Sequence, residues 1–128
     1  MPKSYYADNI TLNLFLRNIT FVPPVQVYLA LMLASPSPSG GGTEVAGHGY
    51  GRQIVTMGAP VNGACSNTAD IVFPVDVVAD WTTVVAFALY DAASGGNLLY
   101  YANLSTSRYV AVGDMIKFPA SQLVATET

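Results

Sequence analysis

The feature that most constrains this chain is a series of short apolar runs, each closed by a turn signal. In most of them apolar side chains alternate with polar or small ones. A period of two is typical of β-strands, because successive side chains point to opposite faces of a sheet. We predict strands over residues 50–57, 69–75, 82–90, 98–104, 109–112 with 115–118, and 122–126.

The clearest hairpin joins residues 82–90 to 98–104, because a glycine-rich turn at 94–97 separates two alternating runs. Residues 25–34 also alternate, with leucines on one face and mildly apolar residues on the other, which predicts a strand buried on both sides. The chain has no internal repeat, so no fibrous shaft is encoded. The expected fold is mainly β, a single β-sandwich or compact barrel with an N-terminal helix.

Residues 4–18 form the one helix candidate, in which Ser4 can cap the first turn and Asp8 lies near the positive end of the dipole. The alternation of residues 10, 12, 14 and 16 leaves a strand as the alternative. Two prolines, Pro23 and Pro24, end this segment. We therefore divide the chain into an N-terminal helix or arm (1–20), packed on one end of a β-domain (21–128). Residues 35–49, rich in proline and glycine, are expected to form a flexible loop.

Charged residues make up 10% of the chain and hydrophobic residues 52%, whereas soluble domains carry about 25% charged residues. A net charge of −3 offers no basic patch for nucleic acid. We find neither a signal peptide nor an apolar run long enough to span a bilayer, so we expect synthesis in a cytoplasm and no membrane partner. So few charges predict an assembly in which neighbouring subunits cover part of the surface; a neutral β-domain coated with Ser and Thr is the alternative.

The chemistry-bearing residues favour structural roles. A single His48 and a single Cys65 exclude a histidine-based metal site and an internal disulfide. Asp76 and Asp80 are close enough in sequence to suggest a carboxylate pair, but turn capping is favoured. Trp81 opens an apolar strand and is expected to anchor the core. We predict no catalytic, cofactor-binding or metal-binding residues.

Several segments, in this order, resemble a family of small bacteriophage virion proteins that are often labelled tail-fibre-like. The matching segments are spread over nearly the whole chain: 27–31, 42–53, 67–74, 79–81, 90–101, 112–114 and 118–120. The resemblance implies a non-enzymatic structural protein, located in the virion and made in the bacterial host cytoplasm. The favoured role is a capsid decoration or cement subunit that binds the major capsid protein, with a homotrimer as the expected oligomer.

Two alternatives remain beside that role. One is a tail-fibre or baseplate-associated module involved in host attachment. The other, from a different class, is a carbohydrate-binding module or small hydrolase, which would need an exposed aromatic platform or a carboxylate pair in a cleft.

The matched segment 42–53 contains a polar motif that physical chemistry explains without catalysis. Glu44 and Arg52 flank a glycine-rich turn, so a return of the chain can pair them while Tyr50 covers the pair. Gly47 and Gly49 permit backbone angles that other residues avoid. We predict that this motif anchors one end of the loop 35–49.

Overall fold

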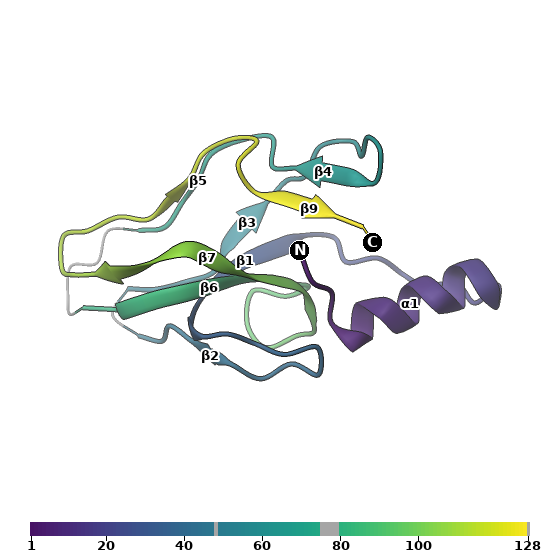
Figure 1. Cartoon of the computed structure of the whole chain (residues 1–128), viewed down its shortest axis with the longest axis horizontal. Coiled ribbons are helices and arrows are strands. Elements are labelled where there is room, and N and C mark those ends of the chain that lie inside the picture. Colours follow the sequence, from purple (N-terminus) through teal and green to yellow (C-terminus); the bar gives the residue numbers. More distant parts are fainter. Residues whose placement is uncertain (48, 75–79, 128) are drawn as a thin grey trace.

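The computed structural model of the protein describes residues 1–47, 49–74 and 80–127. Within these residues the chain forms one α-helix followed by nine β-strands (Figure 1). The elements are α1 (Tyr5–Leu16), β1 (Val27–Ala34), β2 (Thr43–Glu44), β3 (Gln53–Val55), β4 (Ala64–Ser66), β5 (Ile71–Val72), β6 (Thr82–Tyr90), β7 (Leu98–Val110), β8 (Lys117–Phe118) and β9 (Val124–Thr126).

The strands form one antiparallel main sheet and two short antiparallel ribbons. The main sheet has the order β2-β1-β6-β7, and β3 pairs with the same edge of β1 that β2 uses further along. The ribbons, β4–β9 and β5–β8, lie above this sheet in the view of Figure 1. The sheets do not close into a barrel, so the fold is the sandwich-like alternative of the predicted mainly β class.

The core fills the space between the main sheet and the ribbons. Alternate residues of β1, among them Leu29 and Leu31, point to this side and are fully buried. Ala30 and Met32 point to the opposite face and are buried in a second, smaller cluster. This burial on both sides confirms what the alternation in β1 predicts. The remaining buried members of the main cluster are Val45, Val55, Ile71, Phe73, Trp81, Val84, Leu89, Val110, Ile116 and Leu123.

The central hairpin is confirmed, since β6 has the predicted bounds and pairs with β7. The prediction of two separate strands at 98–104 and 109–112 is wrong, because β7 is continuous through residue 110. The register shift explains the difference: Val84 faces Arg108, whereas Ala86 faces Asn103. The polar stretch between those two partners is accommodated as a bulge, and the strand continues beyond it.

Two further short strands lie where turns or loops are predicted. β4, with Cys65 at its centre, lies between the predicted strands 50–57 and 69–75, and β2 lies within the stretch 35–49. Both strands are short, two or three residues, so neither carries an alternation that the sequence could reveal. β2 forms because the longer strand β1 offers backbone groups to it, and β4 forms by pairing with β9, a strand of equal length from the C-terminal segment.

The N-terminal segment is helical, as its cap predicts. Ser4 has an extended backbone and its Oγ accepts the Ala7 N–H at 3.1 Å. At the other end, Asn18 adopts a left-handed conformation (φ 53°), and the Ile19 N–H donates to the Asn13 carbonyl at 3.0 Å.

The expectation that this helix packs onto the β-domain is wrong. No residue of α1 is buried, and the helix projects from the body with its main contact to β7 (Figure 1). Polar and apolar side chains occur on all sides of the helix, so no apolar face runs along its whole length to hold it against the body.

Candidate functional site

The pairing of β2 and β3 with one edge of β1 brings the predicted polar motif together. Glu44 lies opposite Met32 of β1, and Gln53 lies opposite Leu29. Arg52, which precedes Gln53, therefore enters beside Glu44 although eight residues separate them. Strand register, rather than a simple hairpin, positions the two charged side chains.

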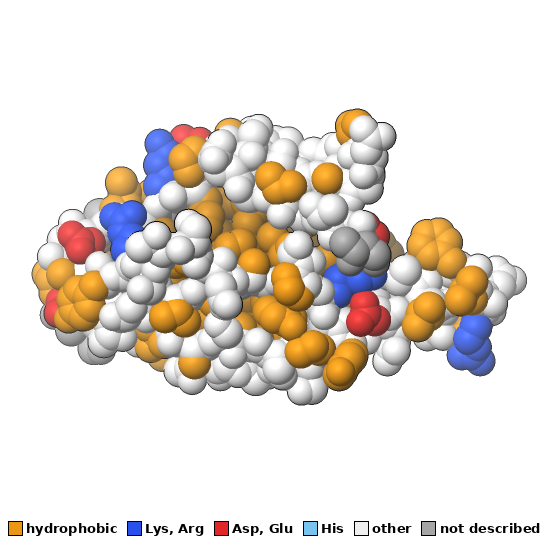
Figure 2. All heavy atoms as spheres, viewed as in Figure 1, with side chains coloured by type: hydrophobic (Ala, Val, Ile, Leu, Met, Phe, Trp, Pro, Cys, Tyr) orange, Lys and Arg blue, Asp and Glu red, His pale blue; other side chains and the backbone are white. Residues whose placement is uncertain are grey.

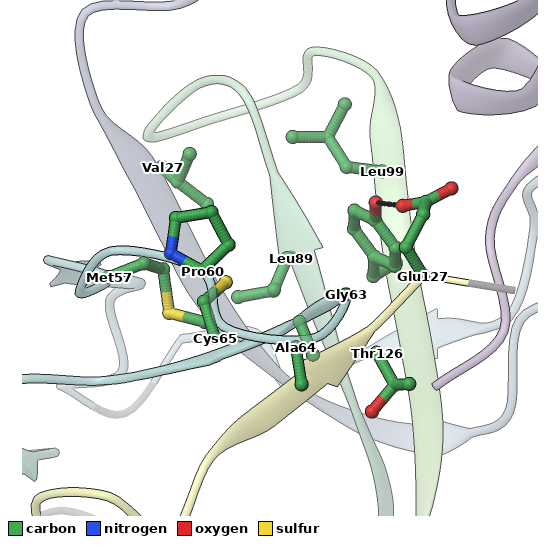
Figure 3. A pocket seen from close by; sticks show the side chains of 12 residues that line it. Val27, Met57, Pro60, Gly63, Ala64, Cys65, Leu89, Leu99, Thr126 and Glu127 are labelled. Atoms are coloured by element: carbon green, nitrogen blue, oxygen red, sulfur yellow. Dashed lines mark hydrogen bonds between the residues drawn. The ribbon is translucent and has the colours of Figure 1, made fainter.

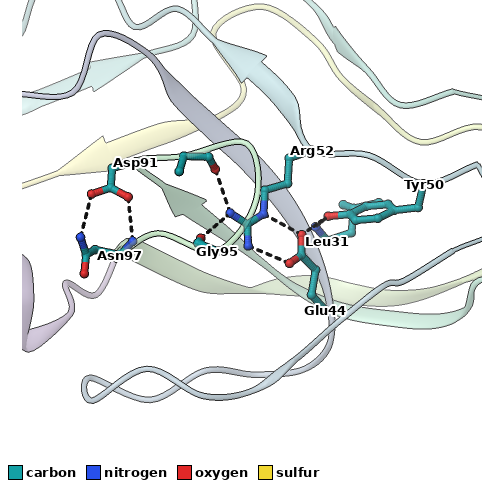
Figure 4. A network of polar contacts seen from close by, with 8 residues as sticks. Leu31, Glu44, Tyr50, Arg52, Asp91, Gly95 and Asn97 are labelled. Atoms are coloured by element: carbon teal, nitrogen blue, oxygen red, sulfur yellow. Dashed lines mark hydrogen bonds and ion pairs between the residues drawn. The ribbon is translucent and has the colours of Figure 1, made fainter.

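Arg52 is the centre of the resulting network, which we call the Arg52 clamp (residues 44, 50 and 52) (Figure 4). Its Nε and Nη2 donate to the two carboxylate oxygens of Glu44, each at 2.8 Å. Its Nη1 donates to the carbonyls of Ala92 and Gly95, both at 2.8 Å, and its guanidinium lies 3.9 Å from the ring centroid of Tyr90. The clamp thus joins β2, the start of β3 and the β6–β7 turn.

Tyr50 connects this ion pair to the core. Its hydroxyl donates to Glu44 at 2.6 Å and accepts the Leu31 N–H at 3.0 Å. Its ring stacks on Phe73 and meets Trp81 edge-on, with centroids 6.0 and 5.5 Å apart. Burial, followed by the hydrogen bond to Glu44, raises the pKa of Tyr50 far above its ordinary value, so the phenol stays neutral.

The ion pair also shifts Arg52. The hydrogen bonds to Glu44 raise the pKa of Arg52 further above its ordinary value, so the guanidinium is a permanent cation and does not exchange protons. Its side chain is 7% exposed, which leaves little access for a ligand. The clamp therefore has the geometry of an internal anchor rather than of a reactive centre.

The two glycines of the motif lie in the left-handed region. Gly47 and Gly49 have φ values of 70° and 79°, and the Tyr50 N–H donates to the Gly47 carbonyl at 3.0 Å. A side chain at either glycine would meet open space, so the requirement for glycine is conformational. His48 lies outside the described residues. The structure thus brings Glu44, Tyr50 and Arg52 together, with Trp81 against Tyr50; that they anchor the loop stays a prediction.

A second polar cluster, not found from the sequence, joins the two ends of the chain. Lys3 forms a short hydrogen-bonded ion pair with Glu127 and lies 3.5 Å from Asp8. The Tyr100 hydroxyl donates to Glu127 at 2.6 Å. Burial would raise the pKa of Glu127, but the hydrogen bonds from Lys3 and Tyr100 hold it below its ordinary value. More than 120 residues separate Lys3 from Glu127, and nothing in the local sequence indicates their contact.

Asn67 is the other polar residue that the sequence does not reveal. It is 1% exposed; its Nδ2 donates to the carbonyls of Ala69 and Pro119, and its Oδ1 accepts the Leu123 N–H at 2.9 Å. These bonds hold the C-terminal segment beside the β4–β5 connection. The one signal in the sequence is that Asn67 lies between two predicted strands. The same is true of any asparagine in a turn, so this position does not identify it.

The residues weighed for catalysis have structural surroundings. Asp80 accepts the Tyr109 hydroxyl at 2.5 Å and the Val112 N–H at 2.9 Å, which is a turn cap, and Asp76 lies outside the described residues. The lone tryptophan, Trp81, is buried, and the most exposed aromatic side chain is Phe15 on α1. In the described part of the chain, no three side chains of His, Cys, Asp or Glu gather as a metal site would require. Nor does this part hold a helix with the length and apolar character that a membrane crossing needs.

A β-sandwich whose polar clusters tie its own segments together, and whose helix projects with apolar side chains, defines a structural module. A comparison of the chain with known protein families agrees with this structural role. The chain belongs to the family described as Podophage GP4 fiber I protein gp80, whose model matches residues 2–126. No curated protein matches the chain. The resemblance to small phage virion proteins is thereby confirmed, and the protein is a virion structural protein of the fibre-like kind.

Proposed function

We propose that this protein is a non-enzymatic fibre-associated subunit on the tail side of the virion. The family description names a fibre protein, which favours this role over the capsid decoration that the sequence analysis places first. The sandwich acts as a rigid body, and the projecting segment 5–26, which we call the arm, attaches it to neighbouring virion protein.

The observation that carries the attachment role is the state of α1. Phe15 and Leu16 expose 80% and 76% of their surface, and Val22 and Val25 in the following segment expose still more. Exposed apolar patches on a monomer seldom exceed a few hundred Å², and larger ones mark sites of contact with other proteins. The arm is therefore built for a partner that covers it.

A capsid decoration role is supported by a different observation. The chain is one compact sandwich with no repeated element, which fits a subunit attached at single sites between capsomers as well as it fits a fibre. Under that alternative the arm would bind the major capsid protein.

Labelling of intact virions distinguishes the two roles. Antibodies against the purified sandwich, detected with gold, are expected at the tail and absent from the head surface. Labels spread over the head would replace the fibre role by the decoration role. Labels absent from the virion altogether would overturn both.

The arm is tested separately by incorporation into virions. Phe15→Ser is expected to reduce incorporation strongly, because it removes the most exposed apolar side chain of α1 without touching the body. Val112→Ser, an apolar side chain 51% exposed on the body, is the matched control and should incorporate normally. Equal incorporation of both variants would contradict an attachment role for the arm.

A further inference from the structure

An apolar pocket is present among the described residues of the sandwich. The pocket measures about 240 Å³ and lies between the main sheet and the β4–β9 ribbon (Figure 3). Val27, Leu89 and Leu99 line it from the sheet, and Cys65 and Ala125 line it from the ribbon. A dry apolar cavity of roughly 150 Å³ already accommodates benzene, so this pocket has room for one aromatic side chain.

The same chain carries a side chain that fits. Leu12, Phe15 and Leu16 lie three and four residues apart, so they form one stripe along α1, and all three are more than half exposed. Apolar side chains lie exposed along this projecting helix, with one basic side chain near its end (Figure 2). Phe15 is the largest of the stripe and lies near the free end of the helix.

The tip of the arm and the wall of the pocket carry side chains of opposite charge. Arg17, two residues beyond Phe15, is the single charged side chain between Asp8 and Glu44. The wall of the pocket carries Glu127, whose side chain is 44% exposed although it is paired with Lys3, so its carboxylate can accept a second cation. The cation at the tip of the arm can thus meet an exposed carboxylate at the wall of the pocket.

We propose that the arm of one copy inserts Phe15 into the β4–β9 pocket of a second copy, with Arg17 beside Glu127 of that copy. The arm cannot easily serve its own pocket. Ser4 donates to the Leu98 carbonyl, and its N–H donates to the Leu99 carbonyl at 2.9 Å, so the start of the helix is fixed while its far end points away from the body (Figure 1).

Because each copy offers one arm and one pocket, the contact is heterologous, joining two different surfaces. Such a contact either closes into a ring, as a homotrimer would, or continues from copy to copy. The inference deepens the proposed function by naming the arm's partner, and it rests on that function in treating the arm as an attachment element.

The native Cys65 gives a direct test, because it lines the pocket and is a free thiol. In a Leu16→Cys variant, which keeps Phe15, mild oxidation of the purified protein should produce an intermolecular disulfide between residues 16 and 65, identified by peptide mapping. Adding Cys65→Ser should abolish this product. A Val112→Cys variant, with its thiol on the body and Cys65 intact, is the matched control and should stay monomeric after oxidation.

Three results would overturn the proposal. They are a 16–65 disulfide formed within one chain, a cross-link that survives Cys65→Ser, and no cross-linking of Leu16→Cys beyond that of the Val112→Cys control. The virion labelling does not depend on this pairing, so failure of the cross-link would remove the second copy as partner and leave the virion position to be decided by labelling.

Sedimentation of the unoxidised protein supplies a second measurement. Phe15→Ser and the pocket-filling Ala125→Phe should each weaken self-association at least tenfold, whereas Val112→Ser should leave it unchanged. Fluorescence of the buried Trp81 checks that each variant is folded. Wild-type protein that stays monomeric, or variants that associate as wild type does, would refute the pairing.

Discussion

Replacing Arg52 with Ala tests whether the clamp holds the loop, and its cost can be worked out from the structure. The substitution removes four hydrogen bonds of 2.8 Å, two to Glu44 and two to backbone carbonyls, and the contact with the Tyr90 ring. Breaking a buried ion pair costs about 3–5 kcal/mol. The Glu44 side chain is 25% exposed and can be partly rehydrated, so we expect a loss of about 2–4 kcal/mol in the free energy of unfolding.

Urea unfolding followed through Trp81 fluorescence measures this loss, because Trp81 is buried and contacts Tyr50 of the clamp. In a thermal scan the same loss corresponds to a decrease in Tm of about 10 °C for a chain of this size. Arg52→Lys should recover part of the stability, since Lys keeps the charge but cannot bind both carboxylate oxygens.

The matched control is Arg17→Ala, which removes an exposed arginine bonded to Asn13 alone among the contacts described, and it should change stability by less than about 0.5 kcal/mol. In a double-mutant cycle, Arg52→Ala and Glu44→Ala should be coupled by about 1–3 kcal/mol. Additive effects of the two changes, or an Arg52→Ala protein as stable as wild type, would show that the clamp anchors nothing.

Four other positions give further expectations. Ser4→Ala should reduce the helix content seen by far-UV circular dichroism and cost about 1 kcal/mol, because it removes the N-cap; unchanged helicity would contradict the capping role. Asn67→Ala should cost about 3 kcal/mol in urea unfolding, because it leaves buried backbone groups unpaired, and a loss below 1 kcal/mol would contradict this. Gly96→Ala should destabilise more than Gly95→Ala, since both have positive φ but only an alanine at 96 meets neighbouring atoms, the nearest at 2.5 Å; equal melting temperatures would refute this. The lowered pKa of Glu127 means that its contribution is present above about pH 4.3 and is lost as the pH falls through the folded-state pKa, so Glu127→Gln should flatten the acid limb of a stability–pH profile.

The parts of the fold that the sequence predicts well are those with long periodic patterns or a specific cap. β6 has the predicted bounds because nine consecutive residues alternate, and α1 begins after Ser4 because serine binds the first-turn amides. The pairing of Glu44 with Arg52 is also accessible from the sequence, since opposite charges flank a glycine-rich return. In these cases the information lies within about ten residues of chain.

The rest depends on contacts between distant segments. β4 and β9 are three-residue strands that pair across about sixty residues, and the Lys3–Glu127 contact joins the two ends of the chain. Neither contact can be recognised from the local sequence, because a distant segment supplies half of each interaction. The orientation of α1 is not predicted from the sequence for a different reason: its apolar residues indicate burial, but within the described residues the β-domain does not cover them.

The distribution of charge over the protein bears on the role of the projecting arm. Most of the few ionised side chains bind within the chain: Lys3, Glu44, Arg52 and Lys117 take part in ion pairs, and aspartates such as Asp80 cap turns. Such charges stabilise the sandwich but are partly neutralised, so they contribute less to keeping molecules apart in water. The arm adds several exposed apolar side chains and one cation to this weakly charged surface. A chain that uses its charges internally and exposes apolar residues on a projecting helix has a stable body and an arm whose surface is suited to contact with another protein, which is the role we propose for it.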